Sequence, residues 1–234
     1  MIEEKDIETY LSISSSAVRI YLFDIKNCKN LFKEELIYTN EEKTINLNIL
    51  NSFLEENFFK IEKLLGNFIN NIFLIVENKN ITNTYFGIKK KIYDETINMR
   101  NLENMLKDAK DLFKENYRNE KIMHLIIDKY IVDGRNYFSF QDDLKGENFC
   151  LELQFSSISN STVQQIEKVL EKFHIKISHY INGNYIKKML EKENLEFSEM
   201  VHKVKSGFNE NEVKLIPKNL GKKGFFEKFF QLFS

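Results

Sequence analysis

Three consecutive serines, Ser14 to Ser16, are the residues of this 234-residue chain whose type and spacing first suggest chemistry. They lie between two β-branched and aromatic runs, so the sequence predicts a tight turn between two strands. A serine nucleophile of the elbow type needs flanking glycines, and none stands near this turn. Phosphate loops also need glycine, because backbone N–H groups must approach the anion closely. The chain has eight glycines and no two in a G-x-G arrangement, so neither nucleophilic catalysis nor nucleotide binding is indicated.

Histidines, cysteines and paired carboxylates are the other candidates for catalysis or metal binding. The histidines have no second histidine at i+3 or i+4 and no cysteine at ligand spacing, so we interpret them as core or surface residues. They are His124, His174, His179 and His202. The adjacent carboxylates at 41–42 and 142–143 are expected to be solvated, and Lys89 to Lys91 to mark a solvated strand edge. No catalytic residue, metal or cofactor is predicted.

Composition narrows the function classes further. With 42% apolar residues, the chain can form one large domain or two small ones with real cores. The formal net charge is -1, so no overall field draws the protein to nucleic acid. The two cysteines, Cys28 and Cys150, form no motif and suit a reducing compartment. The acidic start does not resemble a signal peptide, and no stretch has transmembrane length. These features predict a cytoplasmic protein.

Strands and helices that must position these residues alternate along the chain. Period-2 and continuous apolar runs predict strands over 10–24 (two, joined by the serine turn), 31–38, 72–76, 85–92, 121–133 (one strand or a strand pair), 149–155 and 175–181. Helical spacing predicts helices from a cap at Asn46 to Gly66, over 101–114, from a cap at Ser161 to 173, and over most of 185–205. A short apolar run over 213–216 is compatible with a last strand. This order predicts an α/β fold in two units.

The last fourteen residues, 221–234, carry an aromatic stripe. At about 100° per residue, the apolar side chains share one helical face, with two lysines before it. These residues are Lys222, Lys223, Phe225, Phe226, Phe229, Phe230, Leu232 and Phe233. A bilayer span needs about 20 apolar residues, so this segment is predicted to lie in the membrane interface. A helix docked on its own domain and a self-association zipper are the alternatives. Pro217 interrupts the preceding stretch, which makes 206–220 a predicted linker.

Two stretches, 97–109 (INMRNLENMLKDA) and 122–134 (IMHLIIDKYIVDG), place residues at intervals shared with one protein family. The residues that match in the second stretch are His124, Tyr130, Asp133 and Gly134. Ile127 stands where that family has proline, and 174–185 resembles its strand that returns from an inserted subdomain. The family is FtsA, the actin-like protein of bacterial cell division, whose membrane-targeting sequence the end of this chain also resembles. The resemblance covers roughly residues 8–195 and the end of the chain.

The chain departs from the FtsA pattern at the phosphate loops. The family's first loop reads Asp-Ile-Gly-Thr-Ser-Lys, and its carboxylate, glycine and lysine are all replaced here. The residues of this degenerate loop are Ser12, Ser14, Ser15, Ser16 and Ala17, with Ile13 retained. The returning strand is followed by no Asp-Gly-Gly-Gly-Thr loop, and no counterpart of the second lobe, which carries the family's adenosine site and its FtsZ-docking surface, is recognised. The resemblance therefore implies a nucleotide-free relative, in which binding of the tubulin-like FtsZ is not expected.

The expected architecture is α/β: half of an actin-like fold with an inserted strand-helix-strand-strand subdomain and a C-terminal amphipathic helix. The expected divisions are a first-lobe subdomain (8–83), the inserted subdomain (84–174), a return to the first lobe (175–205), a linker (206–220) and a membrane-targeting helix (221–234).

The function implied is that of a non-catalytic scaffold or adaptor at the division site. It tethers other cell-division proteins to the lipid surface on the inner face of the cytoplasmic membrane and associates weakly with further copies of itself. Two alternatives remain. One is a soluble protein-binding adaptor, like the pilus-assembly relatives of FtsA, with its tail docked on its own body. The other, an ATPase, is disfavoured by the degenerate loop.

Overall fold

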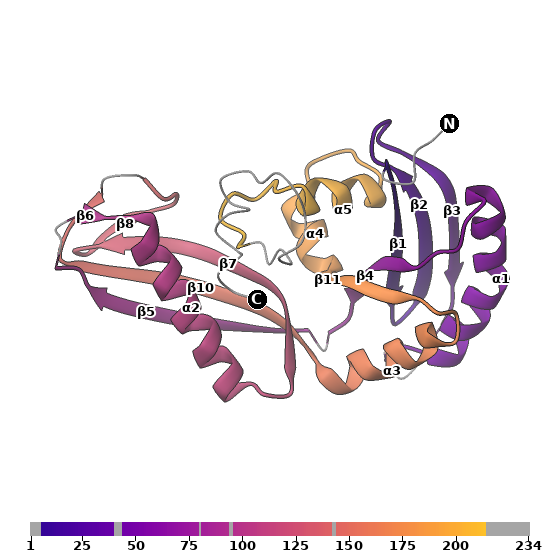
Figure 1. Cartoon of the computed structure of the whole chain (residues 1–234), viewed down its shortest axis with the longest axis horizontal. Helices are drawn as coiled ribbons and strands as arrows, with labels where there is room; N and C mark the ends of the chain where they lie inside the picture. Colours follow the sequence, from indigo (N-terminus) through magenta and orange to yellow (C-terminus); the bar gives the residue numbers. More distant parts are fainter. Residues whose placement is uncertain (1–5, 40–43, 80, 94–95, 142–143, 214–234) are drawn as a thin grey trace. The chain divides into compact units, whose positions relative to one another are not determined.

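The computed structural model describes residues 6–39, 44–79, 81–93, 96–141 and 144–213. The chain divides into two compact units (Figure 1). The first unit consists of Met1–Ile81 and Ile158–Phe208, and the second of Thr82–Ser157 and Asn209–Ser234. Among the described residues, the first unit combines a sheet with four helices and the second combines strands with one helix, so the predicted α/β class is confirmed.

The first unit is built on a five-stranded sheet with the order β11-β4-β1-β2-β3. Its strands are β1 (Ile7–Ser14), β2 (Ala17–Asp24), β3 (Lys29–Ile37), β4 (Asn71–Glu77) and β11 (Lys176–Asn182). The β1-β2 and β2-β3 pairs are antiparallel, whereas β4 runs parallel to both β1 and β11. The carboxyl ends of β1, β4 and β11 therefore meet at one edge of the sheet, where ligands bind in many α/β proteins.

Helices cover the first unit's sheet. Helix α1 (Leu47–Leu65) begins at the predicted cap, because the side chain of Asn46 accepts hydrogen bonds from the N–H groups of Asn48 and Ile49. It ends at Gly66, whose φ of 70° is readily adopted only without a side chain. Helices α4 (Gly183–Met189) and α5 (Phe197–Lys205) pack on a cluster that includes Tyr10, Phe23 and Ile75. The predicted helix over 185–205 is thus two helices with a break between them.

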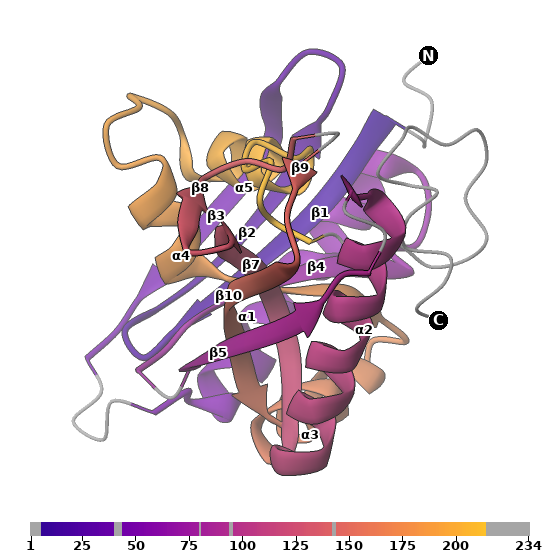
Figure 2. The ribbon, with the colours of Figure 1, turned by 90° about the vertical axis from the view of Figure 1, so that its left-hand side faces the viewer.

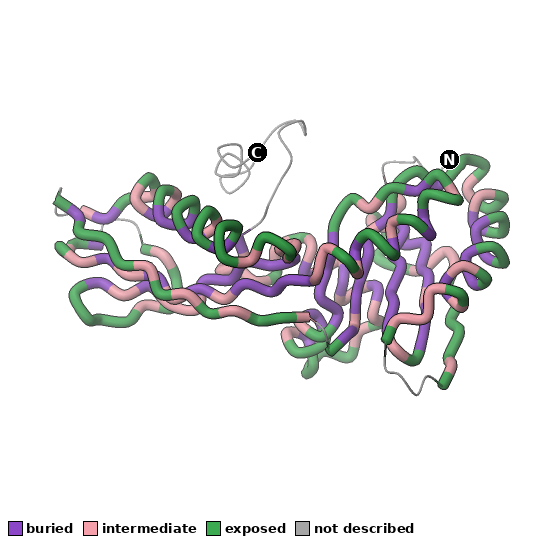
Figure 3. The backbone as a smooth tube through the Cα atoms, turned by 90° about the horizontal axis from the view of Figure 1, so that it is seen from below, coloured by how far each residue is buried: buried purple, intermediate pink, exposed green. Residues whose placement is uncertain are grey.

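The second unit has a four-stranded sheet in the order β5-β10-β7-β8. Its strands are β5 (Thr82–Lys91), β7 (Glu120–Val132), β8 (Arg135–Tyr137) and β10 (Asn148–Ser159); β6 (Thr96–Ile97) and β9 (Leu144–Lys145) form a separate ribbon. Along β10, Leu151, Leu153 and Phe155 are buried while Cys150 is half-buried, which confirms the predicted alternation. Helix α2 (Met99–Asn116) packs against β5 and turns its buried positions toward the strands (Figure 2, Figure 3).

Residues after Phe208 pair with the second unit. Glu212 forms a bridge with Ile126 of β7, and the N–H of Val213 donates to the carbonyl of Leu125 at 2.8 Å. The 209–213 part of the predicted linker is therefore held by backbone hydrogen bonds. The predicted last strand over 213–216 is described only at Val213, since its other residues lie outside the described part of the chain.

The boundary of the inserted unit differs from the predicted range of 84–174, since the structure places helix α3 (Asn160–Glu171) in the first unit. The reason is its apolar face: Val163, Ile166 and Leu170 are buried. Phe173, just beyond α3, packs against Phe58 of α1 with tilted rings whose centroids are 5.2 Å apart.

The Ser161 cap is a wrong prediction. Helix α3 begins one residue earlier, at Asn160, and its N-cap Ser159 makes no side-chain capping bond. The Ser161 hydroxyl lies 2.6 Å from that of Ser159 instead. Helical spacing also predicts apolar faces that include Leu64, Phe68 and Leu112, but these side chains are 57%, 78% and 40% exposed.

Candidate binding site

The serine turn between β1 and β2 satisfies its own polar groups. The Ser14 hydroxyl accepts hydrogen bonds from the N–H groups of Ser16 (3.2 Å) and Ala17 (2.8 Å), and donates to the carbonyl of Ala17 (3.1 Å). Ser14 is buried, Ser15 half-buried and Ser16 exposed. The turn is therefore closed by side-chain-to-backbone bonds of the kind serine favours in turns, which ties up the one buried hydroxyl.

A charge cluster, defined as Ser12, Arg19, Glu35, Glu77 and Lys187, lies at the carboxyl edge of the first unit's sheet. Parallel pairing sets Ser14 of β1 beside Glu77, the last residue of β4. The Glu77 side chain is only 9% exposed; it accepts from the Ser12 hydroxyl at 3.1 Å and lies 3.5 Å from the Arg19 guanidinium. Lys187 of α4 forms an ion pair with the second carboxylate oxygen of Glu77.

Glycine is required beside this cluster. A Cβ on Gly183, the first residue of α4, would overlap Glu77 Cγ and lie 3.0 Å from Ile75 Cγ2. The missing side chain thus lets the Glu77 carboxylate lie against the start of the helix that carries Lys187.

The cations of the charge cluster are already engaged. Arg19 is shared between Glu77 and Glu35, whose carboxylate lies 2.5 Å from its Nε. Lys187 is paired with Glu77. An incoming phosphate would have to displace Glu77, a largely buried carboxylate with three partners, at the cost of leaving its charge uncompensated. The arrangement neutralises charge internally and presents no free anion-binding group.

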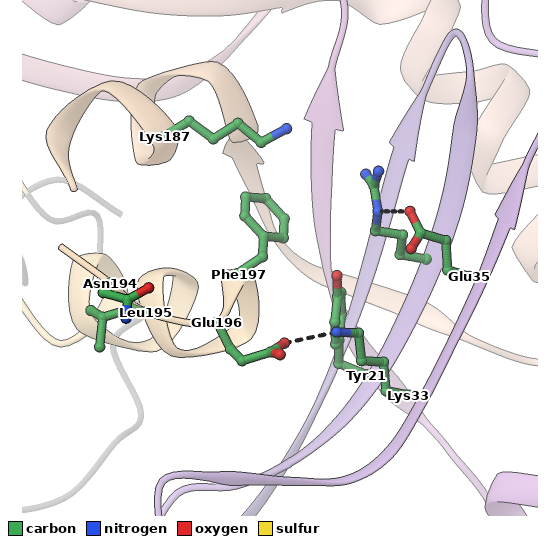
Figure 4. Close-up of a pocket in the computed structure, with 9 residues that line it drawn as sticks. Tyr21, Lys33, Glu35, Lys187, Asn194, Leu195, Glu196 and Phe197 are labelled. Atoms are coloured by element: carbon green, nitrogen blue, oxygen red, sulfur yellow. Dashed lines mark hydrogen bonds and ion pairs between the residues drawn. The ribbon is translucent and has the colours of Figure 1, made fainter. Parts of the chain in front are cut away.

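A pocket of about 510 Å³ adjoins the charge cluster on the same face. Figure 4 shows its walls: β2 and β3 on one side, α4 and the segment before α5 on the other. The residues that line it are Arg19, Tyr21, Lys33, Glu35, Lys187, Asn194, Leu195, Glu196 and Phe197. Lys33 pairs with Glu196 at 2.8 Å across the pocket. Burial raises the pKa of Tyr21 to about 12, so its hydroxyl stays protonated and can donate a hydrogen bond.

The residues of the pocket are better suited to binding a polar side chain of a partner than to catalysing a reaction. Tyr21 and Phe197 have ring centroids 6.3 Å apart, and the Lys187 ammonium lies 5.3 Å from the Phe197 ring. The pair of Lys33 and Glu196 is about half exposed on both sides, and exposed pairs of this kind contribute little. A ligand could therefore replace that pair at small cost. Aromatic side chains such as Tyr21 and Phe197 are enriched at protein-contact surfaces.

The four histidines do not come together. His124 of β7 lies 2.6 Å from a Glu212 carboxylate oxygen in the second unit. In the first unit, His179 stacks on Phe73 and His202 lies against Phe23, while His174 adopts a φ of 57°. Across the described ranges, no group of three or more histidine, cysteine or acidic side chains could hold a metal ion.

Two other groups of predicted residues have different outcomes. Lys89, Lys90 and Lys91 are exposed on the end strand of the second sheet, as expected. The carboxylate pairs at 41–42 and 142–143 lie outside the residues described.

The membrane-binding residues predicted over 222–233 also lie outside the described part of the chain, so their role stays a prediction. Among the residues described, no helix is long and apolar enough to cross a bilayer.

No protein-family model matches the chain, and no curated protein matches it in sequence. Its structure is similar to that of a PilM–PilN type IV pilus biogenesis complex, at 10% identity and a TM-score of 0.46, over 80% of this chain and 52% of that one. It is also similar to the cytoplasmic domain of EpsL, an inner-membrane component of the type II secretion system of Vibrio cholerae. That match has 8% identity and a TM-score of 0.36, over 76% of this chain and 59% of the other.

A third similar structure is a Bacteroides thetaiotaomicron protein of unknown function with an actin-like ATPase fold. The match has 16% identity and a TM-score of 0.32, and covers 83% of this chain and 61% of that one. The chain thus spans about half to three-fifths of the proteins it matches. All three TM-scores lie below 0.5, so these likenesses assign no function to the chain.

Sequence reasoning placed the serine turn correctly but missed Arg19, Glu77 and Lys187. Two signals point to them. Arg19 is the only charged residue in the run Ala17 to Phe23, and Glu77 follows directly on the apolar run of β4. A charge inside or just after an apolar strand must find a partner, since unpaired burial is costly. Lys187 carries no such signal, because one helical lysine resembles any other in sequence.

Proposed function

We propose that this protein is a non-catalytic adaptor that binds other proteins and is held at the inner face of a membrane by its C-terminal segment. The observation that supports the non-catalytic part is the position of the Glu77 carboxylate. It engages Ser12, Arg19 and Lys187 beside the turn that corresponds, by resemblance, to a phosphate loop. The carboxylate occupies the two cations that could otherwise attract nucleotide phosphates.

Nucleotide binding provides the test of this part. Isothermal titration of the full chain with Mg-ATP and Mg-ADP is expected to show no binding up to millimolar concentration. A ligand at 100 times its Kd would add about 2.7 kcal/mol to the free energy of unfolding, so thermal denaturation supplies an independent readout. Glu77→Gln is the informative variant, because it removes the charge that pairs with Arg19 and Lys187 and leaves both cations in place. Micromolar affinity of the unchanged protein for ATP would overturn the proposal.

Membrane attachment rests on the apolar stripe near the C-terminus. Phe226→Glu with Phe230→Glu places two charges on that stripe, so sedimentation with anionic liposomes should be lost while the thermal midpoint changes little. Gln231→Glu with Ser234→Glu is the matched control, since it adds the same charges to the predicted polar face and should retain most binding. Easy unfolding of the first variant would mean that the tail is docked on the body.

Salt separates the two forces at the membrane. Each of Lys222, Lys223 and Lys228 can add about 1 kcal/mol near an anionic surface, and this term is screened over about 8 Å at physiological salt. Raised salt is therefore expected to weaken liposome binding without abolishing it. Complete loss in salt would contradict an apolar anchor.

The soluble adaptor is the competing proposal, with the tail on its own body. Cell fractionation of the full chain and of a chain ending at residue 220 distinguishes the two, because only a membrane anchor changes the fraction in which the protein is found. The setting is a finer proposal: the resemblance over 97–134 favours cell division, which predicts a fluorescent fusion at the division site. PilM and EpsL belong to pilus and secretion assemblies, at TM-scores that decide nothing between these settings.

A further inference from the structure

Strand β5 forms an open edge of the second unit's sheet. It pairs with β10 along its whole length, from Thr82 opposite Ser157 to Lys91 opposite Asn148, with no register shift. In an antiparallel ladder, alternate residues direct their N–H and C=O groups away from the partner strand. β5 therefore presents a regular row of backbone groups along its outer edge. In the ranges that the structure describes, no other strand pairs with that edge (Figure 1).

The side chains divide β5 into a neutral part and a basic part. The residues before Lys89 are uncharged and include β-formers such as Tyr85, Phe86 and Ile88. Lys90 turns toward α2, where its ammonium lies 2.6 Å from the Asp108 carboxylate. Lys89 and Lys91 alternate to the other face and are both exposed. Neither takes part in an ion pair with a described residue, although Lys89 lies close enough to the Asp133 carboxylate to help lower the pKa of that group. Both exposed ammonium groups can therefore contact an incoming carboxylate.

A gap on the same face adds a feature of shape. Gly87 lies between Tyr85 and Lys89 on this face, and a Cβ placed on it would meet nothing within 4 Å. Tyr85 is 67% exposed beside it. A glycine within a strand often marks a place where another chain approaches closely. An apolar side chain of an added strand can lie over Gly87 and against the Tyr85 ring.

We propose that the outer edge of β5 binds an extended segment of a partner protein, with carboxylates at one end and uncharged β-forming residues in the rest. The segment adds a strand to the sheet, so its backbone supplies affinity and its alternate side chains supply specificity. Its carboxylates lie beside Lys89 and Lys91. Lysines on a sheet edge disfavour pairing with arbitrary strands. Here their charge favours pairing with an acidic strand over other strands.

Charge argues against two other occupants. The chain's own residues 214–234 contain five lysines and one glutamate, so they would repel the basic end of β5. Two β5 strands in a centred antiparallel pair would place Lys89 to Lys91 opposite Thr82 to Thr84, which compensates none of the charge. The inference deepens the proposed adaptor function by specifying a partner class, and its test is independent of nucleotide and lipid binding.

Two labelled ten-residue peptides test the charge requirement on the full chain. One has three glutamates followed by alternating valine and threonine; the other has lysines in place of the glutamates. Fluorescence anisotropy should detect binding of the acidic peptide only. Lys89→Glu with Lys91→Glu should weaken that binding about tenfold or more, as expected for two lost and two repulsive contacts, and should allow the basic peptide to bind. Lys107→Glu with Lys145→Glu, the same charge change at exposed sites off the edge, should leave it within twofold. Equal loss in both variants would overturn the proposal.

Backbone pairing has its own test. Two acidic peptides N-methylated at odd or at even positions remove donors from one or the other edge of the added strand. Strand addition uses only one edge, so one peptide should lose binding and the other keep it; the same result for both would overturn strand addition. Sedimentation of the protein alone tests whether a second copy of the chain pairs with the β5 edge. A dimer that dissociates when Lys89→Glu and Lys91→Glu are introduced would show that this edge binds another copy, and would overturn the proposal of a partner segment.

Discussion

Glu77 and Gly183 show how single residues determine the charge and the packing at the carboxyl edge of the first unit's sheet. The carboxylate is nearly buried and is neutralised by Arg19 and Lys187. The Cγ methylene of Glu77 occupies the space that a side chain on Gly183 would need. Each residue therefore constrains the other, although 106 positions (183 minus 77) separate them in the sequence.

A double-mutant cycle measures this constraint. Gly183→Ala should lower the free energy of unfolding by about 1–3 kcal/mol, because the methyl group overpacks against Glu77. In a Glu77→Ala background the same change should cost clearly less, since most of the overlap is gone while Ile75 remains in contact. Urea denaturation of the four proteins gives the coupling. Equal costs in the two backgrounds would show that Gly183 is needed for its backbone alone.

His202 gives stability a pH dependence. Burial lowers the pKa of this histidine below its ordinary value of 6.5, and its ring lies against Phe23. Below about pH 6.5 the unfolded chain binds a proton that the folded chain does not, so the free energy of unfolding decreases as the pH falls through this value. His202→Gln should flatten the decrease between pH 7 and pH 5.5. Measurements at pH 8 provide the baseline, and an unchanged slope would assign the effect to other groups.

At the scale of elements, the start of one helix, α1, could be predicted from the sequence, whereas the start of another, α3, could not. Asn46 was recognisable as a cap because the following apolar residues begin a clear helical period, and its carbonyl oxygen accepts two backbone N–H bonds at 3.1 Å. Near α3, serines stand at 156, 157, 159 and 161, so residue type alone could not select the start. Tertiary packing of the apolar face decides the register there, which explains the wrong assignment of Ser161.

The two starts give a matched prediction. Asn46→Ala should lower the free energy of unfolding by about 1 kcal/mol, because two N–H groups of the first turn lose their acceptor. Asn46→Asp should retain stability, as both side chains cap well. Ser161→Ala should change it by less than about 0.5 kcal/mol, because this hydroxyl caps nothing. Thermal denaturation of the three variants suffices, and a large effect at Ser161 would show that its bond with Ser159 stabilises the helix.

The strand pattern was the more predictable part of the fold. β4 and β10 follow from apolar runs and alternation, since a buried face leaves one register possible. The boundary between the units was not predictable in the same way. At the entry, Thr82 is the first residue of β5 and lies two residues from the predicted start at 84. At the exit, Ser157 lies inside β10, and no glycine or proline marks the change of unit there. The charge cluster escaped prediction for a related reason: its members come from β1, β2, β3, β4 and α4, and only the sheet order brings them together.

At the scale of the whole molecule, a near-neutral chain has a local excess of positive charge over residues 214–234. The formal net charge is -1, yet residues 214–234 hold five lysines against one glutamate. Such a distribution directs that end toward an anionic surface while the rest of the protein is not attracted. A single short interfacial segment binds membranes only marginally, and stable anchoring generally needs a second signal.

The second signal is expected to be another copy of the same protein. Copies that associate on the membrane multiply weak contacts into avidity, so liposome binding should rise more steeply than linearly with protein concentration. Sedimentation with and without vesicles, for the full chain and for a chain ending at residue 220, measures this. We expect weak association in solution, stronger association on lipid, and no effect of vesicles on the shortened chain. A protein that stays monomeric and still binds vesicles tightly would show that one tail suffices, and self-association would then have no part in anchoring.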